Sequence, residues 1–176
     1  MRILSLVPVG RVAGEHLQYL AERMAARWEA ACLIQPAWQD GEVAYHAGRG
    51  QYHSTAILKQ LLRHPHRESW RILGVTEADL YIPILTFVFG EAQLGAGAAL
   101  VSTHRLRPEF HGLPPDPRLL QERLLKEAIH ELGHTLGLHH CANYLCVMSA
   151  SHSVERIDLK QPDFCPACAA ACSAGP

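Results

Sequence analysis

Residues 130–148 contain the side chains with the clearest capacity for chemistry. His130 and His134 are four residues apart, so on a helix both imidazoles lie on one face and can reach a single metal ion. A catalytic zinc ion takes three protein ligands and keeps a fourth position for water. Gly137 can adopt the positive φ that ends a helix and turns the chain back. The spacing therefore predicts that a histidine just beyond this glycine supplies the third ligand.

His140 is the expected third ligand, because the pattern H-E-x-x-H-x-x-G-x-x-H followed by a methionine turn places a histidine at this offset. His139 is the rival, one position off that spacing. A downstream carboxylate is a further alternative, since Glu155 and Asp158 lie at a distance that other zinc enzymes use. Glu131 is not needed as a ligand and is expected to be the general base that takes a proton from a zinc-activated water.

Four cysteines follow as two close pairs, Cys141 with Cys146 and Cys165 with Cys168. Two such pairs separated by a loop are typical of a closed, structural zinc site. Two disulfides, or unrelated buried thiols, are the alternative interpretation. Cys172 could replace one member of the set, and we expect it to be spare.

Taken together, these residues resemble the archaemetzincin family, in which a metzincin zinc motif is followed by a four-cysteine zinc site. The resemblance is carried by residues 130–137, His140, Met148 and the four cysteines. The loop that follows Met148, residues 149–164, is one residue shorter than in the family pattern, a difference that a loop tolerates. Residues 87–102 also resemble the family's sheet.

The resemblance implies an α/β fold of the α+β kind, with a metzincin-like twisted mixed sheet, packed helices, an active-site helix and a Met turn. It implies one metallopeptidase domain over residues 1–176. The N-terminal subdomain would cover residues 1–137, and a short C-terminal subdomain, residues 138–176, would be held together by the structural zinc. Met148 would form an apolar floor below the ligands without binding the metal. The small residues between 91 and 102 form either a hairpin or, as the resemblance favours, the edge strand that pairs with an extended peptide.

The elements that must position these residues follow from hydrophobic periodicity and boundary signals. Strands are predicted at residues 1–9, 31–36, 72–75, 80–82 and 85–89, and helices at residues 14–29 and from Ser54, as the cap, to Pro65. Residues 40–50 and 108–117 are polar or proline-rich, and we expect them to be loops.

A long helix is expected to end in the zinc motif. Leu120, Leu124, Ala128 and Leu132 recur at helical spacing and predict its buried stripe. Glu127 falls on the side of the zinc ligands, where it could accept a hydrogen bond from a histidine. We favour a solvent-exposed glutamate instead, because the starts of helices commonly carry acidic residues.

Length and composition limit the remaining possibilities. The 176 residues are 48% hydrophobic with a formal charge of -1, which is typical of one globular domain with a sizeable core. The lack of a basic excess argues against a nucleic-acid partner. The apolar run Ile3–Val7 is too short for a signal peptide, and no later segment is long enough to cross a membrane. We expect a cytoplasmic monomer without a pro-segment, whose thiols stay reduced and available to zinc.

The sequence therefore predicts a zinc-dependent metallopeptidase that acts on peptides or proteins and binds two zinc ions per chain. The expected ligands are His130, His134 and His140 for the catalytic zinc, and Cys141, Cys146, Cys165 and Cys168 for the structural zinc. The alternative is a catalytically weak or inactive, zinc-stabilised interaction module, in which the water position on the histidine site is blocked.

Overall fold

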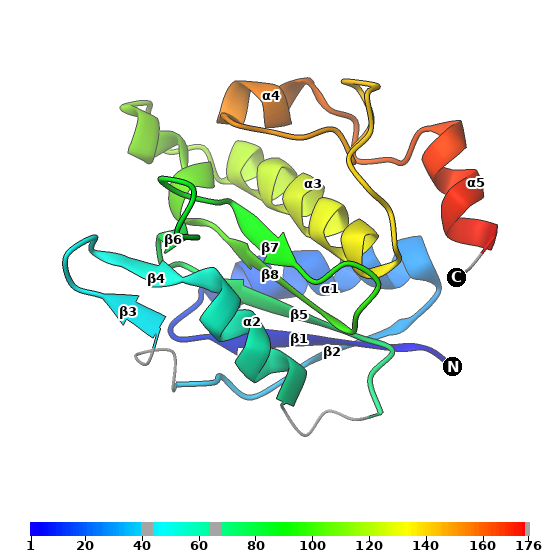
Figure 1. Cartoon of the computed structure of the whole chain (residues 1–176), viewed down its shortest axis with the longest axis horizontal. Coiled ribbons are helices and arrows are strands. Elements are labelled where there is room, and N and C mark those ends of the chain that lie inside the picture. The colour runs from blue at the N-terminus through cyan, green and yellow to red at the C-terminus, as the bar shows by residue number, and fades with distance from the viewer. Residues whose placement is uncertain (40–43, 64–67, 175–176) are drawn as a thin grey trace.

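The chain is built on a twisted mixed sheet of five strands in the order β2-β1-β5-β8-β7 (Figure 1). The computed structural model describes residues 1–39, 44–63 and 68–174. Four strands are parallel, and the edge strand β7 runs antiparallel to β8. In sheet order the strands are β2 Ala31–Ile34, β1 Ile3–Val9, β5 Arg71–Thr76, β8 Ala98–Ser102 and β7 Gly90–Ala92. A small second sheet has the order β3-β4-β6, with β3 Tyr45–His46, β4 Gln51–His53 and β6 Leu80–Tyr81.

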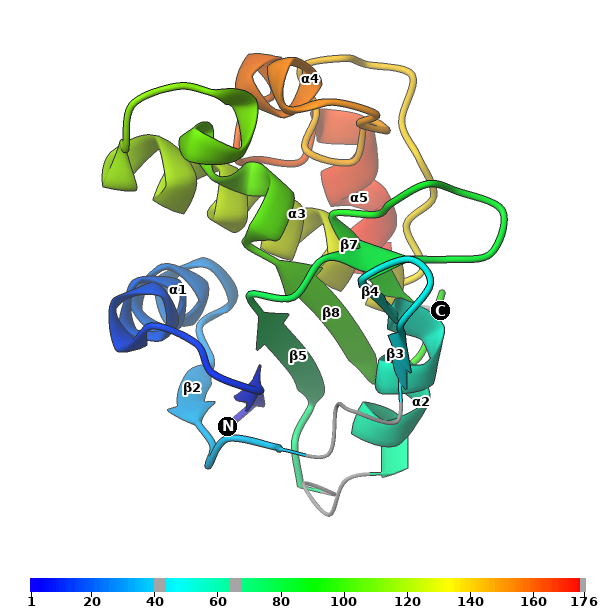
Figure 2. The same cartoon turned by 90° about the vertical axis from the view of Figure 1, so that its left-hand side faces the viewer.

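Helices cover both faces of the main sheet because its strands are apolar on both sides. In β1, Leu4 and Leu6 point to one hydrophobic cluster, and Val7 and Val9 point to the other. The first cluster is covered by α1 and α3, and the second by α2, which lies on the opposite side of the sheet (Figure 2). The helices are α1 Gly14–Trp28, α2 Ser54–Arg63, α3 Pro117–Thr135, α4 Val154–Leu159 and α5 Pro166–Ala174. The two-sided burial explains the near-continuous apolar runs of the central strands.

Most predicted elements are confirmed within a few residues of their expected bounds, and two are wrong. Residues 85–89, expected as a strand, form a loop. An isolated β-bridge between Leu80 and Val88 connects this loop to β6. The expected loop at 40–50 contains β3, whose Tyr45 and His46 pair with β4. Residues 40–43, and the predicted helix stop at Pro65, lie outside the described residues.

Two further predictions need correction at the edge of the sheet. Strand β8 is interior, between β5 and β7, and its five residues are all buried. The edge strand is the shorter β7. Ser54 does not accept a capping hydrogen bond; its hydroxyl donates to the Tyr81 carbonyl and to the carboxylate of Glu91 in β7. This pairing ties the start of α2 to the edge strand.

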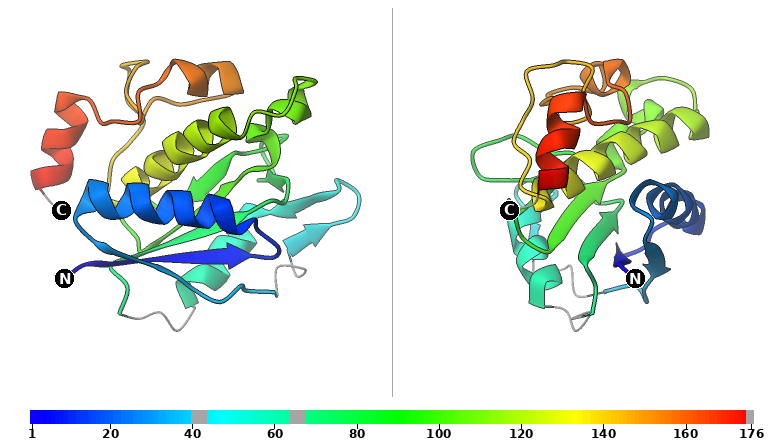
Figure 3. Two further views of the ribbon diagram at one scale, coloured as in Figure 1. Left: turned by 180° about the vertical axis from the view of Figure 1, so that it is seen from behind. Right: turned by 90° about the vertical axis from the view of Figure 1, so that its right-hand side faces the viewer.

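The C-terminal part packs along α3 and beside the end of α1 (Figure 3). Two main-chain hydrogen bonds join its segments: Gln161 donates to Leu145 at 2.8 Å, and Val147 donates to Asp163 at 3.0 Å. Helices α4 and α5 were not predicted from the sequence. Among the described helices, none combines the length and apolar composition that a membrane span requires.

Candidate metal centre and active site

Helix α3 sets the position of the zinc motif. It starts at Pro117, where the Asp116 side chain accepts a hydrogen bond from the Leu119 backbone N–H at 3.0 Å, the arrangement of an N-cap followed by proline. The predicted stripe is buried, as expected for a helix packed on a sheet. Its members are Leu120, Leu124, Ala128 and Leu132. The cap and the stripe together fix the rotation of the helix, and so the face on which the histidines lie.

The chain turns back immediately after the second histidine. Gly137 has φ +86°, and its N–H donates to the His134 carbonyl at 3.0 Å, so the helix ends with a left-handed residue. The return brings His140 over the helix end. The ring centroids lie 4.7 Å apart for His130 and His134, 5.2 Å for His130 and His140, and 5.0 Å for His134 and His140.

The hydrogen bonds of two rings select the tautomer that a metal requires. His130 Nδ1 donates to the Val147 carbonyl at 2.8 Å, and His134 Nδ1 donates to the Leu138 carbonyl at 2.7 Å. Each Nε2 therefore carries a lone pair, and the two Nε2 atoms lie only 3.1 Å apart. Two lone pairs at this distance repel unless a cation lies beside them. The three imidazoles thus fit a metal such as zinc.

The charge state of the rings agrees with this fit. Burial lowers the pKa of His130 well below its ordinary value and also lowers the pKa of His140, and the Lys160 ammonium adds to both effects. Burial lowers the pKa of His134 as well. The rings are therefore neutral at neutral pH, the state that binds metal. His140 is exposed, so the group is open to solvent on one side.

Glu131 lies in a site that is almost closed to solvent. It is 6% exposed and faces the edge strand, where a Cβ at Gly90 would come within 2.8 Å of its Oε1. Burial raises the pKa of Glu131 well above its ordinary value, and the carboxylates of Glu127 and Glu91 add to the rise. A carboxyl group of this kind can exchange protons near neutral pH.

A pocket of about 290 Å³ opens beside these groups. Its walls come from the loop at 85–90, from Glu127, His130 and Glu131 on α3, and from His140 with residues 150–152. The loop wall is held from the β3–β4 turn: Arg49 donates to the Leu85 and Thr86 carbonyls at 2.9 and 3.1 Å, and Gln51 donates to Thr86 at 3.0 Å.

Glu127 is the site residue for which the sequence prediction was wrong. It is 3% exposed, not solvated, and its Oε1 accepts a hydrogen bond from Lys160 Nζ at 3.3 Å. Lys160 is itself 2% exposed, so the two form a buried ion pair. No local pattern could have identified Lys160, because it is 33 residues away in sequence.

Met148 lies below the motif as an apolar residue, fully buried. It packs against α3 at Gly133, where a methyl group would overlap the Met148 sulfur and approach the Phe164 ring to 3.2 Å. The glycine inside the motif is therefore required for this close approach. The Cys141 N–H donates to the Met148 carbonyl at 2.9 Å. This bond ties the segment at Met148 to the segment that carries His140.

The two cysteine pairs also converge. The sulfurs of Cys141, Cys146, Cys165 and Cys168 all lie within 4.8 Å of one another, and the Cys165 N–H donates to the Cys146 sulfur at 3.3 Å. The backbone N–H of Cys168 lowers the pKa of Cys165 to about 7, whereas burial raises the pKa of Cys168. The four sulfurs would not all ionise without a cation among them, and four thiolates are a donor set that zinc favours.

Other candidates from the sequence do not join either group. Within the described residues, His139 and Cys172 lie outside both convergent sets. Asp158 is paired with Arg123 at 2.7 Å, and Glu155 is exposed at the start of α4. Asp158 therefore joins α4 to α3, and neither carboxylate belongs to the convergent histidine group.

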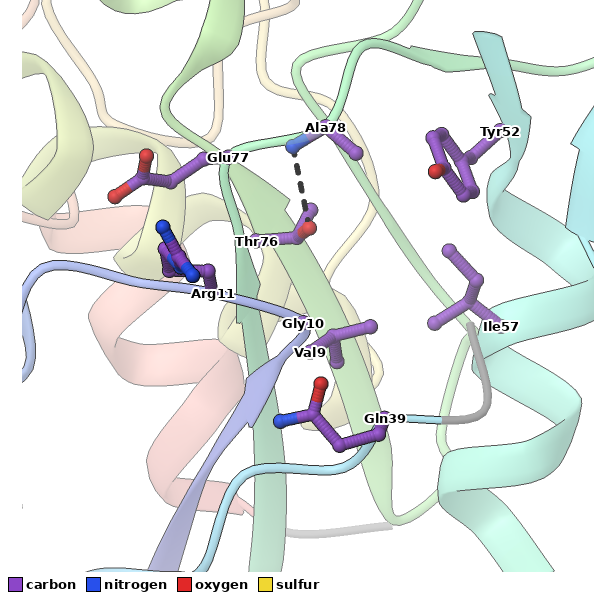
Figure 4. Close-up of a pocket in the computed structure, with 9 residues that line it drawn as sticks. All are labelled: Val9, Gly10, Arg11, Gln39, Tyr52, Ile57, Thr76, Glu77 and Ala78. Atoms are coloured by element: carbon purple, nitrogen blue, oxygen red, sulfur yellow. Dashed lines mark hydrogen bonds between the residues drawn. The ribbon is translucent and has the colours of Figure 1, made fainter. Parts of the chain in front are cut away.

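A second cavity, of about 230 Å³, lies where the carboxyl ends of β1 and β5 meet (Figure 4). Its described lining holds no histidine or cysteine. Glu77 accepts hydrogen bonds from the Ala13 N–H at 2.9 Å and from Arg107 at 2.8 Å, and Thr76 accepts from the Ala78 N–H at 3.2 Å. These polar groups hold the neighbouring turns, so the cavity brings together no reactive set.

Comparison with known proteins points to one family. Peptidase family M54 matches residues 32–173. An archaemetzincin from Methanocaldococcus jannaschii is 49% identical over 168 residues, covering 96% of this chain and 90% of that protein. One from Pyrococcus furiosus is 40% identical, covering 94% and 90%. The crystal structure of archaemetzincin from Archaeoglobus fulgidus, complexed with malonate, has a TM-score of 0.85 at 38% identity and covers 96% of this chain and 99% of that one. The archaemetzincin structure from Methanopyrus kandleri has a TM-score of 0.84, also at 38% identity, covering 98% and 94%.

Proposed function

The chain belongs to peptidase family M54, the archaemetzincins, and is a zinc metallopeptidase; we propose that it hydrolyses peptide bonds with Glu131 as the general base beside a zinc ion. His130, His134 and His140 would hold that zinc. The convergence of the two Nε2 atoms at 3.1 Å is the observation that carries this assignment. When bound there, zinc supplies a Lewis acid that polarises the scissile carbonyl and acidifies water.

The remaining steps belong to residues of this chain. The Glu131 carboxylate takes a proton from the attacking water and passes it to the leaving amine. The near-complete burial of Glu131 supports this role, because a buried carboxyl group accepts and releases protons closer to neutral pH than an exposed one. The pocket beside it is lined by Phe87, Phe89 and Ala150 among others, so part of the wall next to the reacting groups is apolar.

A second zinc ion would be held by the cysteine group. Four thiolates leave no position for water, so this site would stabilise the fold without taking part in the reaction. Cys141 follows His140 directly in the chain, so the thiolate site would also fix the approach of the third histidine. Two zinc ions per chain, of different chemistry, are the expected content.

Replacing Glu131 with Ala tests the mechanism. None of the three imidazoles is touched, so zinc at the histidine site should be retained while hydrolysis of a peptide library falls by ~10²- to 10⁴-fold, the usual cost of losing a general base. Zinc content is measured on the same preparations as activity.

Two histidine variants serve as matched controls for that experiment. His140→Ala should lose zinc together with activity, whereas His139→Ala, on the neighbouring exposed residue, should change little. The reverse result would reassign the third ligand. Full activity in Glu131→Ala, with contaminating peptidases excluded, would reject Glu131 as the general base, whereas a zinc-loaded wild type without activity would favour the zinc-stabilised interaction module.

A further inference from the structure

Lys160 is a buried cation that the proposed mechanism does not use. It is the C-cap residue that directly follows α4, and its side chain is 1% exposed. Its ammonium group donates to Glu127 Oε1 at 3.3 Å and to the Val147 carbonyl at 3.2 Å. Burying an ammonium group is costly even when it is paired. The contacts made by its two partners, Glu127 and the Val147 carbonyl, indicate a role for Lys160 beyond packing.

The Val147 carbonyl is the point where Lys160 meets the histidine site. The same oxygen accepts the Nδ1 hydrogen bond of His130 at 2.8 Å. The Val147 N–H is also engaged, donating to Asp163 at 3.0 Å. The backbone of Val147 is thus held through both its N–H and its carbonyl, by α3 and by the segment that carries Lys160 and Asp163.

We propose that Lys160 is a positioning residue for His130, acting through the Val147 carbonyl to which both side chains donate. The inference rests on the proposed function, in which His130 is a zinc ligand. The ammonium fixes the direction of the carbonyl, and the carbonyl keeps the proton on Nδ1 and so directs the Nε2 lone pair toward the metal. Glu127, one helical turn before His130, supplies the compensating charge.

A packing role alone does not account for this arrangement, because the neighbouring Lys126 already joins α3 to the C-terminal segment. Lys126 Nζ donates to the carbonyls of Ile157 and Asp158 at 3.2 and 3.1 Å. It therefore joins α3 to the same C-terminal segment, but with none of its hydrogen bonds to Val147. Lys126 is a matched control. It carries the same charge and also joins α3 to the C-terminal segment, but it makes no hydrogen bond to the Val147 carbonyl that His130 uses.

The test compares Lys160→Met, the double variant Glu127→Gln with Lys160→Met, and Lys126→Met. The double variant removes both buried charges, so that it folds even where the single variant does not. Zinc affinity of the histidine site is measured by competition with a chromophoric chelator, after the thiolate site has been filled. Cobalt substitution identifies the thiolate site separately, through its sulfur charge-transfer absorption.

We expect zinc affinity at the histidine site to fall by ~10- to 100-fold in both Lys160 variants, the usual effect of losing a partner that orients a metal ligand, and to stay at the wild-type value in Lys126→Met. In the zinc-free chain, nitrogen NMR should show that His130 has lost its preference for the Nδ1–H tautomer in the same two variants. Neither readout depends on peptidase activity.

Three other outcomes would contradict the positioning role of Lys160. Wild-type affinity and tautomer in the double variant would show that Lys160 serves only to neutralise Glu127, and would overturn the positioning role. Loss of the cobalt–thiolate signal in the double variant would assign Lys160 to folding alone, with the same consequence. A wild-type chain without zinc on its histidines would overturn the proposed function first, and this inference with it.

Discussion

The position of the Glu131 carboxylate depends on a side chain that is missing next to it. A Cβ at Gly90 would lie 2.8 Å from Glu131 Oε1 and 2.6 Å from the Leu100 carbonyl oxygen. The Leu100 backbone is fixed because β8 pairs with strands on both sides. An added methyl group must therefore shift the β7 backbone at residue 90 and displace the Glu131 side chain.

Gly90→Ala is expected to lower peptide hydrolysis by ~10²-fold, the scale of a catalytic group displaced by about 1 Å, while zinc content stays unchanged. Gly97→Ala is the control, because a Cβ at Gly97 has no atom within 4 Å. Steady-state kinetics and metal analysis on both variants check the prediction. Equal activity in the two would show that the carboxylate does not need this space.

The positions of the site side chains were predictable where they depend on local geometry. The spacing of His130 and His134 fixes their common face through the helix period alone, and the structure brings His140 to them as that spacing suggested. Glu127 shows the limit. Its burial depends on Lys160, whose approach is a property of the tertiary fold, so the preference of helix starts for acidic residues pointed to the wrong environment.

Among the elements, the turn after β5 is tied to the segment after β8 by two ion pairs, Arg107 with Glu77 and Arg105 with Asp79. Arg105 donates to both oxygens of Asp79, at 2.7 and 2.8 Å, and Gln51 of β4 donates to the same carboxylate at 3.0 Å. Burial alone would raise the pKa of Asp79, but the Arg105 guanidinium outweighs it and holds the pKa below its ordinary value. The carboxylate thus joins the small sheet to the large one.

The stability of this junction should depend on pH in a defined direction. Because the pKa of Asp79 is lower in the folded chain, its contribution is present above the unfolded pKa of about 3.9 and is lost as the pH falls through the folded pKa. Asp79→Asn should therefore be less stable than wild type by roughly 1–3 kcal/mol at pH 7. The difference should begin to shrink as the pH falls below about 4 and should vanish only below the folded pKa of Asp79, measured by urea unfolding at each pH.

An exposed pair provides the control for that experiment. Asp163 bonds Arg27 at 2.7 Å, but its side chain is 69% exposed. Asp163→Asn should cost less than about 1 kcal/mol at pH 7, as exposed pairs do. Equal losses in the two variants at neutral pH would show that the Asp79 junction adds nothing beyond a surface contact.

Elements were predictable where hydrophobic period and burial agree. The strands β1 and β5 and the helices α1 and α3 are buried in the main core as their patterns indicate. The prediction of a strand at residues 85–89 was wrong because an apolar run looks the same in sequence whether it pairs with another strand or lines a pocket. Here Phe87 and Phe89 face the pocket and pack edge to face at 5.2 Å.

At the scale of the whole molecule, we expect the cysteine site to contribute to stability and the histidine site to contribute to catalysis. Cys165→Ser should lower the melting temperature by roughly 10 °C, because a structural zinc contributes several kcal/mol and a chain of this size loses about 2–4 °C per kcal/mol. His134→Ala should lose one zinc equivalent with a much smaller change in melting temperature. Metal analysis and thermal unfolding of the zinc-loaded proteins check both.

The expected zinc content of wild type in that experiment is two equivalents per chain. A value of one that Cys146→Ser leaves unchanged would remove the structural site. If Cys165→Ser melted like wild type while His134→Ala unfolded, the two roles would be assigned the wrong way round.

The C-terminal part was the least predictable portion of the molecule. Its residues after Met148 have few apolar side chains in the core, chiefly Val154 and Ile157, so periodicity gave no signal for α4 or α5. Its position depends instead on long-range hydrogen bonds and on the cysteine group. Such contacts leave no regular pattern in the sequence.

His140 and Cys141 are consecutive residues that belong to different convergent groups. Ordering the cysteine on its sulfur partners also restricts its neighbour, so less conformational entropy is lost when the histidine joins its own group. Thermodynamic linkage makes this coupling reciprocal: whatever factor one occupied site adds to the affinity of the other is returned in full. The two sites would therefore load cooperatively, and each would bind zinc more tightly when the other is occupied.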